Sequence, residues 1–130
     1  MRCMTVFARR RAGLHGLASP PSLSASSQRK AQDILRCDSI SHFACQRPFT
    51  YWMKRNGYLG ACWRAAENIA WGTRGDTVRS IFQSWISSPQ HRRNILGPYH
   101  DLGVGLETGR LDGRDGIRIW IQHFGSRCGR

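Results

Sequence analysis

The sequence predicts an α+β domain in which helices come first and an antiparallel hairpin comes late. Apolar residues between Val78 and Ile86 repeat at positions i, i+3, i+4, i+7 and i+8, which is typical of a helix with one buried face. In residues 102–106 and 117–122 the apolar period changes to two, which is typical of strands. The apolar face of such a hairpin needs helical cover. A chain of 130 residues is the usual size of one domain, so residues 1–130 are taken as a single unit.

Three helices are expected in the first half of the chain. The first covers residues 4–14, and a Ser/Pro-rich linker over residues 18–27 follows it. A second helix begins after the linker and ends near Arg36, and Pro48 starts a third helix that ends at Gly57. The apolar stripe of the first helix consists of Val6, Phe7 and Leu14.

The second half adds strands around the most regular helix. Residues 67–71 form a short apolar segment that is read as a strand. Asp76 and Thr77 are candidate caps of the helix that follows, and Pro89 stops it. Residues 90–96 add a further helical turn, and the Gly/Asp-rich segment 109–116 joins the two late strands.

The chain is strongly basic, with a formal net charge of +12 and eight acidic residues. Such a surface favours anionic partners in general, whether acidic polymer, anionic lipid or nucleic acid. The sequence has no basic helix with base-reading side chains, no zinc-finger spacing and no aromatic RNA-binding motif, so specific nucleic-acid binding is not expected. No run of about 18 apolar residues is present, so no transmembrane segment is expected.

Five cysteines in a small domain favour an oxidising compartment. No C-x-x-C pair occurs, which argues against a zinc knuckle or a thioredoxin-type motif. Cys3 opens the first helix and Cys37 closes the second, so antiparallel packing would join them. Cys45 and Cys62 flank the third helix. We therefore predict the disulfides Cys3–Cys37 and Cys45–Cys62, with Cys128 free near the end of the chain.

The first residues, Met-Arg-Cys-Met, are not followed by the apolar stretch of a signal peptide. Two interpretations follow. The protein is cytosolic, or the sequence is a fragment or mature form whose export signal lay upstream. The cysteine content favours the second, an extracellular protein.

Three polar residues are candidates for chemistry. Glu67, one of two glutamates, precedes the apolar residues 69–71, where an ionised carboxylate is unfavourable unless it is paired. His91 follows the break at Pro89, and His42 lies just past the second helix. Each histidine taken alone is more commonly a surface or capping residue. Near one carboxylate, however, imidazoles can hold a divalent metal or act as acid and base.

Several motifs resemble those of one family. Residues 66–72 (Ala-Glu-Asn-Ile-Ala-Trp-Gly) resemble a G-E-N-[IL]-A signature, and residues 84–96 resemble an S-W-x-x-S-P-G-H-R-x-N-[IL]-L stretch. Residues 102–106 and 120–125 are similar to two closing strands, and residues 41–42 match a first histidine motif. Together they resemble the bacterial branch of the CAP superfamily, or SCP domain, of cysteine-rich secretory proteins, antigen 5 and pathogenesis-related proteins.

The resemblance implies an α-β-α sandwich whose antiparallel sheet is covered by helices, with a cavity lined by two histidines and two acidic residues. His42, Glu67 and His91 take three of these places, and Asn68 lies beside them in the same motif. His42 and His91 are the implied metal ligands. The fourth place falls near Ser88, so the acidic pair that the resemblance implies for eukaryotic zinc-binding members is incomplete here.

Three positions carry another residue where the family pattern has glycine, namely Gln46, Ala66 and Gln90. Where such a backbone needs a positive φ, a non-glycine residue costs about 1–2 kcal/mol.

The leading hypothesis is a secreted, monomeric module that binds a lipid or sterol-like ligand in its His/Glu-lined cleft. No cofactor is required, although a divalent metal such as zinc fits the cluster. An alternative is a hydrolase of peptide or cell-wall substrates, in which Glu67 and a histidine activate water. A third hypothesis is a non-catalytic basic domain that interacts with a surface. Binding is favoured over catalysis because no Ser, Cys or Thr stands in a recognisable nucleophile motif.

Overall fold

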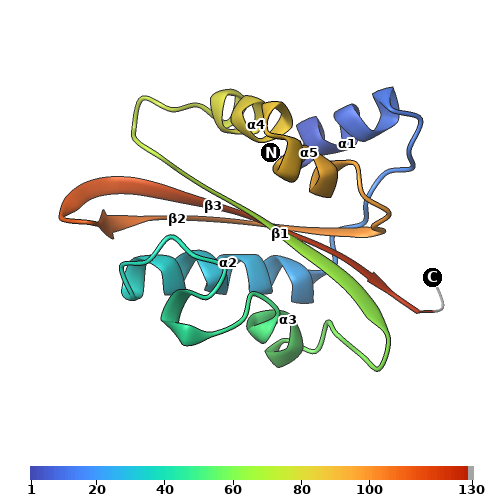
Figure 1. The fold of residues 1–130 in the computed structure, drawn as a ribbon, viewed down its shortest axis with the longest axis horizontal. Coiled ribbons are helices and arrows are strands. Elements are labelled where there is room, and N and C mark those ends of the chain that lie inside the picture. The colour runs from blue at the N-terminus through green and yellow to red at the C-terminus, as the bar shows by residue number, and fades with distance from the viewer. Residues whose placement is uncertain (129–130) are drawn as a thin grey trace.

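A three-stranded antiparallel sheet lies between two layers of helices, as Figure 1 shows. The structure is a computed structural model that describes residues 1–128. One layer contains α1 (Arg2–Arg11), α4 (Val78–Ser87) and α5 (Pro89–Ile95). The other layer contains α2 (Pro21–Arg36), the 3₁₀ turn η1 (Ala44–Gln46) and α3 (Tyr51–Arg55). The predicted α+β class and sandwich are confirmed.

The sheet has the order β1-β3-β2, with β3 (Arg114–Arg127) between β1 (Trp63–Gly72) and β2 (Asp101–Leu111). Side chains alternate between the two layers. Ile119 and Ile121 of β3 pack with α2, whereas Phe124 packs with Trp85 of α4. Glu67 of β1 lies directly opposite His123 of β3. Because paired residues share a face, both side chains point toward the α2 layer.

The predicted Ser/Pro linker over residues 18–27 is wrong. Helix α2 begins at Pro21, so most of that stretch is helix. Pro21 occupies the first turn, where its missing N–H removes no hydrogen bond. The small residues Ser26 and Ser27 are fully buried. A Cβ at Gly103 or Gly105 of β2 would collide with the α2 backbone, so small residues on both elements allow this close approach.

The predicted helix from Val78 is confirmed as α4. Thr77 caps it, accepting a hydrogen bond from the Ser80 backbone N–H in a reciprocal capping box. Of its apolar residues, Ile81 and Trp85 are deeply buried, at 5% and 1% exposure. Val78 stays 36% exposed, so the buried stripe is narrower than the sequence suggests.

The apolar stripe expected on the first helix is wrong, because α1 turns a different face to the sheet. Thr5 and Arg9 are its buried residues, whereas Phe7 is 65% exposed. The Arg9 guanidinium donates hydrogen bonds to the carbonyls of Ile95 and Gly97 at 3.0 and 2.7 Å. Carbonyls at the end of α5 lack helical partners, and Arg9 supplies them.

The predicted disulfide pattern is also wrong. The pairs are Cys37–Cys45 and Cys62–Cys128, and Cys3 is free and exposed. The reason is topological: α1 and α2 lie on opposite faces of the sheet, which therefore separates Cys3 from Cys37 (Figure 1). Both pairs have a Cα separation of 5.4 Å.

The two disulfides fasten different parts of the fold. Cys62–Cys128 closes the end of the β1–β3 ladder, just beyond the pair Trp63 and Arg127.

Of the three positions where the family pattern has glycine, only Gln46 has a positive φ, 58°, within η1. No helix within residues 1–128 has the length and apolarity needed to cross a membrane.

Candidate functional site

Glu67 lies at the centre of a buried polar cluster on the α2 side of the sheet. Its side chain is 1% exposed. His42 Nδ1 lies 2.7 Å from Oε1, and His123 Nε2 lies 2.8 Å from Oε2. The Lys30 ammonium is 3.9 Å from Oε1. Both carboxylate oxygens therefore have an imidazole partner.

The surroundings keep Glu67 ionised. Burial raises the pKa of this carboxyl, but hydrogen bonds from His123 and His42 and the charges of His123 and Lys30 outweigh burial, so the pKa of Glu67 lies below its ordinary value. An ionised carboxylate only accepts hydrogen bonds. His42 Nδ1 and His123 Nε2 consequently carry the protons that they donate to Glu67.

His42 is held at two points. Its ring donates to Glu67, and its backbone carbonyl accepts a hydrogen bond of 2.8 Å from Lys30 Nζ. The His42 side chain is nevertheless 51% exposed. With Nδ1 engaged, Nε2 is the ring atom that remains for a ligand.

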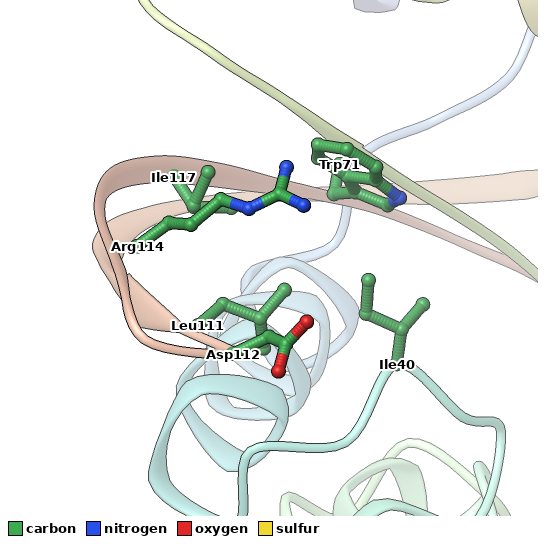
Figure 2. Close-up of a pocket in the computed structure, with 6 residues that line it drawn as sticks. All are labelled: Ile40, Trp71, Leu111, Asp112, Arg114 and Ile117. Atoms are coloured by element: carbon green, nitrogen blue, oxygen red, sulfur yellow. The ribbon is translucent and has the colours of Figure 1, made fainter.

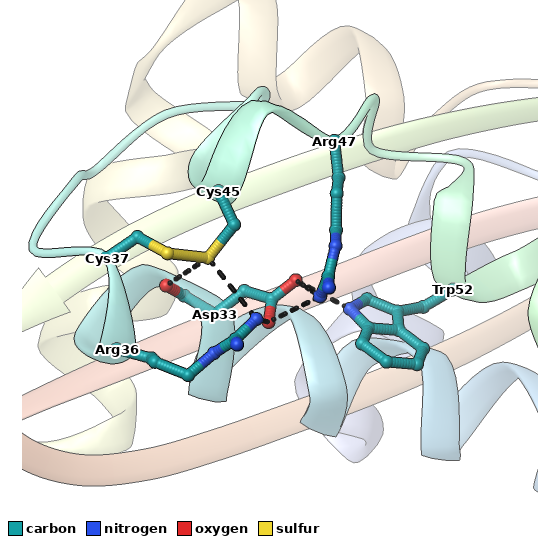
Figure 3. Close-up of a disulfide and its surroundings, with 6 residues drawn as sticks. All are labelled: Asp33, Arg36, Cys37, Cys45, Arg47 and Trp52. Atoms are coloured by element: carbon teal, nitrogen blue, oxygen red, sulfur yellow. Dashed lines mark hydrogen bonds and ion pairs between the residues drawn. A yellow bond between two sulfur atoms is a disulfide. The ribbon is translucent and has the colours of Figure 1, made fainter.

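The segment that carries His42 is tied to α2 by the Cys37–Cys45 disulfide, shown in Figure 3. Next to this bridge, Asp33 accepts hydrogen bonds from Arg36, Arg47 and Trp52 at 2.7–3.1 Å. Burial raises the pKa of Asp33, but these hydrogen bonds from Trp52, Arg36 and Arg47 lower it below its ordinary value. The disulfide at Cys45 and the ion pair between Arg47 and Asp33 together hold the loop that carries His42 against α2.

His123 is a site residue that the sequence analysis missed. It is fully buried, and its Nδ1 lies 2.8 Å from the Ser26 hydroxyl. A signal was present, because His123 continues the alternation of Ile117, Ile119 and Ile121. Extending that strand by one position would have placed an imidazole on the buried face.

His91 lies on α5, in the other helical layer. Its Nδ1 is 2.8 Å from the hydroxyl of Ser88, the position at which a second acid was expected. Burial lowers the pKa of His91, and the positive charge of His42 lowers it further. The two histidines are therefore electrostatically coupled, although the described contacts include no hydrogen bond between His91 and Glu67.

Asn68 holds the backbone rather than facing the Glu67 cluster. Its amide donates to the His91 carbonyl and to Gln122 Oε1, both at 3.2 Å. Its own oxygen accepts a hydrogen bond of 2.8 Å from Asn94, which also reaches the Glu67 carbonyl. This network fixes α5, and with it His91, against the edge of β1.

An apolar pocket of about 120 Å³ lies farther along β1 (Figure 2). Ile40 and Trp71 are among its walls, and neither His42 nor His91 lines it. Ile40 precedes His42 by two residues, and Trp71 shares the β1 face of Glu67. The full lining consists of Ile40, Trp71, Leu111, Asp112, Arg114 and Ile117.

The donor set limits what a metal could find here. Within residues 1–128, no group of three or more His, Cys, Asp or Glu side chains is arranged to hold an ion. His42 and His91 remain as two imidazoles whose Nδ1 atoms are already anchored.

Comparison with known proteins agrees with this fold. Residues 7–124 match the CAP family, described as the cysteine-rich secretory protein family. The chain belongs to this family. It is 31% identical over 124 residues to the uncharacterized protein YkwD of Bacillus subtilis (strain 168), covering 93% of this chain and 44% of that protein. The CAP chain described here thus spans less than half the length of that bacterial relative.

Solved structures show the same fold at low sequence identity. An outer surface protein from Borrelia burgdorferi gives a TM-score of 0.79 at 17% identity, over 97% of this chain and 89% of that one. An extracellular SCP-domain protein from Bacillus anthracis gives 0.77 at 23% identity, over 95% and 38%. A cysteine-rich secretory protein from Staphylococcus aureus gives 0.72 at 18% identity, over 97% and 36%.

Proposed function

We propose that this CAP domain is an extracellular binding module whose binding atoms are Nε2 of His42 and Nε2 of His91. The observation that supports it best is the saturation of Glu67. The Glu67 side chain is 1% exposed, and its two oxygens accept hydrogen bonds of 2.7 and 2.8 Å from two histidines. A carboxylate engaged in this way orients the His42 ring, as such partners do beside ligating histidines.

His91 is suited to the same role. The hydroxyl of Ser88 holds its Nδ1, and burial together with the charge of His42 lowers its pKa. A lowered pKa keeps the imidazole neutral at physiological pH, and the neutral ring is the form that binds a ligand or metal. In this proposal the oriented Nε2 atoms of His42 and His91 face one ligand at the edge of β1.

The residues fit a divalent metal such as zinc only if water or the ligand completes its coordination. His42 and His91 supply two nitrogens, whereas structural zinc sites have four protein ligands and catalytic sites three. The remaining positions would belong to water or to the ligand. When bound, the ion would supply Lewis-acid attraction for an oxygen of that ligand.

The neighbouring pocket favours an amphiphilic ligand. Its volume of about 120 Å³ suits one short apolar group between Ile40 and Trp71. Pockets that enclose drug-sized ligands measure roughly 300–1,000 Å³, so a whole sterol would not be engulfed. The ligand would place its polar group at His42 and a short apolar part beside Trp71.

The proposed extracellular setting rests on the disulfides and on a relative. Two disulfides, Cys37–Cys45 and Cys62–Cys128, suit an oxidising compartment. The similar Bacillus anthracis protein is described as extracellular.

Calorimetric titration with zinc chloride tests the proposed site. His42→Ala and His91→Ala are each expected to weaken binding at least tenfold, and Glu67→Gln about 10- to 100-fold, because it alters the group that orients His42. The control His15→Ala removes an exposed histidine from another part of the molecule and is expected to change nothing. Equal affinity in all four variants would overturn the proposed site.

A hydrolase is the second candidate, since an imidazole that donates to a buried carboxylate at 2.7 Å is the arrangement of a general base. In that reaction His42 Nε2 would take the proton from water, because both oxygens of Glu67 are occupied. Turnover of peptide or cell-wall substrates by the native chain, lost in His42→Ala, would support it. Equal turnover by both proteins would count against it.

A further inference from the structure

The layer formed by α1, α4 and α5 contains no acidic residue. All eight acids of the chain lie outside residues 1–32 and 77–100, which include these three helices, and the acid next to them in sequence, Asp76, accepts a hydrogen bond from the Thr73 backbone in the loop before α4. The exposed arginines of the three helices are Arg2, Arg10, Arg11, Arg79, Arg92 and Arg93. The positive charge of this face is therefore not neutralised within its own layer.

The same face exposes apolar groups beside these arginines. Phe7 of α1 is 65% exposed, although it belongs to the stripe that the sequence marks as core. It lines a groove of about 520 Å³ together with Val6, Arg2 and Arg10. Arginine and aromatic side chains thus share one surface of the helix.

A second groove lies on the other side of α1, where it meets α4 and α5. Ile86 and Leu96 contribute apolar surface to a volume of about 340 Å³, and Arg11 and Arg92 also line it. Both grooves combine apolar side chains with positive charge that no carboxylate of this layer balances. Acyl chains with anionic headgroups have the complementary chemistry.

The opposite helical layer provides an internal comparison. Phe43 is 66% exposed, nearly the same as Phe7. It shares its groove with Arg36 and Arg47, but both arginines are paired with Asp33. Similar aromatic exposure is therefore accompanied by arginines without a carboxylate in their own helices around Phe7, and by arginines that share the Asp33 carboxylate around Phe43.

We propose that the α1–α4–α5 face binds peripherally to an anionic lipid bilayer, with Phe7 entering the acyl region and the surrounding arginines contacting headgroups. Each basic residue near an anionic membrane strengthens binding about fivefold. Burial of one aromatic ring in hydrocarbon strengthens it about tenfold. A soluble polyanion would gain from the arginines but not from Phe7, which favours the lipid surface. This surface is independent of the His42–Glu67 pair.

Vesicle co-sedimentation tests the proposal with the full chain. Vesicles of equal parts phosphatidylglycerol and phosphatidylcholine are expected to bind it, and pure phosphatidylcholine vesicles are not. Phe7→Ala should weaken binding about tenfold, while its matched control Phe43→Ala leaves binding unchanged. The double variant Arg10→Gln/Arg11→Gln should weaken it about 25-fold, from two fivefold factors. Its control, Lys54→Gln/Arg55→Gln on α3, should weaken it much less. All substituted side chains are exposed, so each variant should fold.

A parallel titration with soluble polyphosphate distinguishes the two kinds of anion. Equal loss in Phe7→Ala and Phe43→Ala, or tighter binding of polyphosphate than of anionic vesicles, would overturn the membrane proposal in favour of a polyanion site. Failure of the native chain to bind anionic vesicles, or equal binding to neutral ones, would also overturn it.

Discussion

The two helical layers bury different chemistry against the same sheet. The α2 layer buries carboxylates, with Asp33 and Glu67 both saturated by donors. The α1–α4–α5 layer buries Arg9, whose guanidinium meets only backbone carbonyls, and neutral amides such as Asn68. The comparison shows how a basic chain separates its tasks. Its scarce acids organise one face and the histidine site, and the other face keeps its charge free.

The largest expected effect tests whether the α1–α4–α5 layer contributes to the hydrophobic core. Trp85→Ala should lower the free energy of unfolding by about 3–5 kcal/mol, because it removes a large aromatic that is 1% exposed. It also removes the indole N–H that donates to the Ile69 carbonyl at 3.1 Å. Urea denaturation measures the loss. Trp71→Ala, at a 45% exposed position, is the control and should cost much less. A loss below about 1 kcal/mol for Trp85→Ala would show that α4 is peripheral.

The disulfides sharpen the comparison because only one of them belongs to the histidine site. Replacing Cys62 and Cys128 by Ser opens a loop with a sequence separation of 66 and should cost about 4 kcal/mol in the loop-entropy model. Replacing Cys37 and Cys45 opens a separation of 8 and should cost about 2–3 kcal/mol. Only the second pair should also weaken zinc binding, since it holds the loop of His42. Equal effects of both pairs on zinc affinity would contradict that assignment.

A smaller effect tests the contrast in acid sensitivity. The pKa values of Asp33 and Glu67 are both lowered in the folded chain. A lowered carboxyl pKa stabilises the fold above the ordinary value, and this contribution is lost as the pH falls through the folded value. Asp33→Asn should therefore cost about 1–3 kcal/mol near neutral pH and flatten the decline of stability below about pH 4.

The matched variant in the other layer is Thr5→Val, which removes the buried hydroxyl that accepts a 2.8 Å hydrogen bond from Gln122. It should also cost about 1–3 kcal/mol but leave the acid decline as steep as in the native chain. Denaturation followed from neutral to acidic pH compares the two. An unchanged acid decline in Asp33→Asn would show that its carboxylate is not a source of acid sensitivity.

Periodicity predicted the elements whose burial depends on a repeating face. The α4 helix and the late hairpin follow apolar repeats, so their type was readable from sequence. The stretch 18–27 was not, because serine is polar in composition but small enough to pack against Gly103 and Gly105. Composition describes the side chain, whereas the packing depends on the glycines of a distant strand.

The site was predictable in part for a similar reason. His42 and Glu67 were singled out from motifs, and the structure joins them at 2.7 Å. His123 was missed because its role depends on lying opposite Glu67 across the β1–β3 register. The predicted disulfide pairing was wrong for a topological reason, because the spacing of helices along the chain does not show which face of the sheet each helix covers.

Imidazole nitrogen NMR of His42 tests the central claim most directly. An ionised, buried Glu67 that accepts from Nδ1 requires a proton on Nδ1 of His42, and in the neutral ring this leaves Nε2 bare. At mildly alkaline pH, where ordinary imidazoles are neutral, the native chain should show this tautomer, and Glu67→Gln should shift the ring toward a mixture. Zinc should then perturb Nε2 and not Nδ1. A His42 ring protonated at Nε2 in the native chain, with Nδ1 bare, would contradict both the ionised Glu67 and the proposed binding atom.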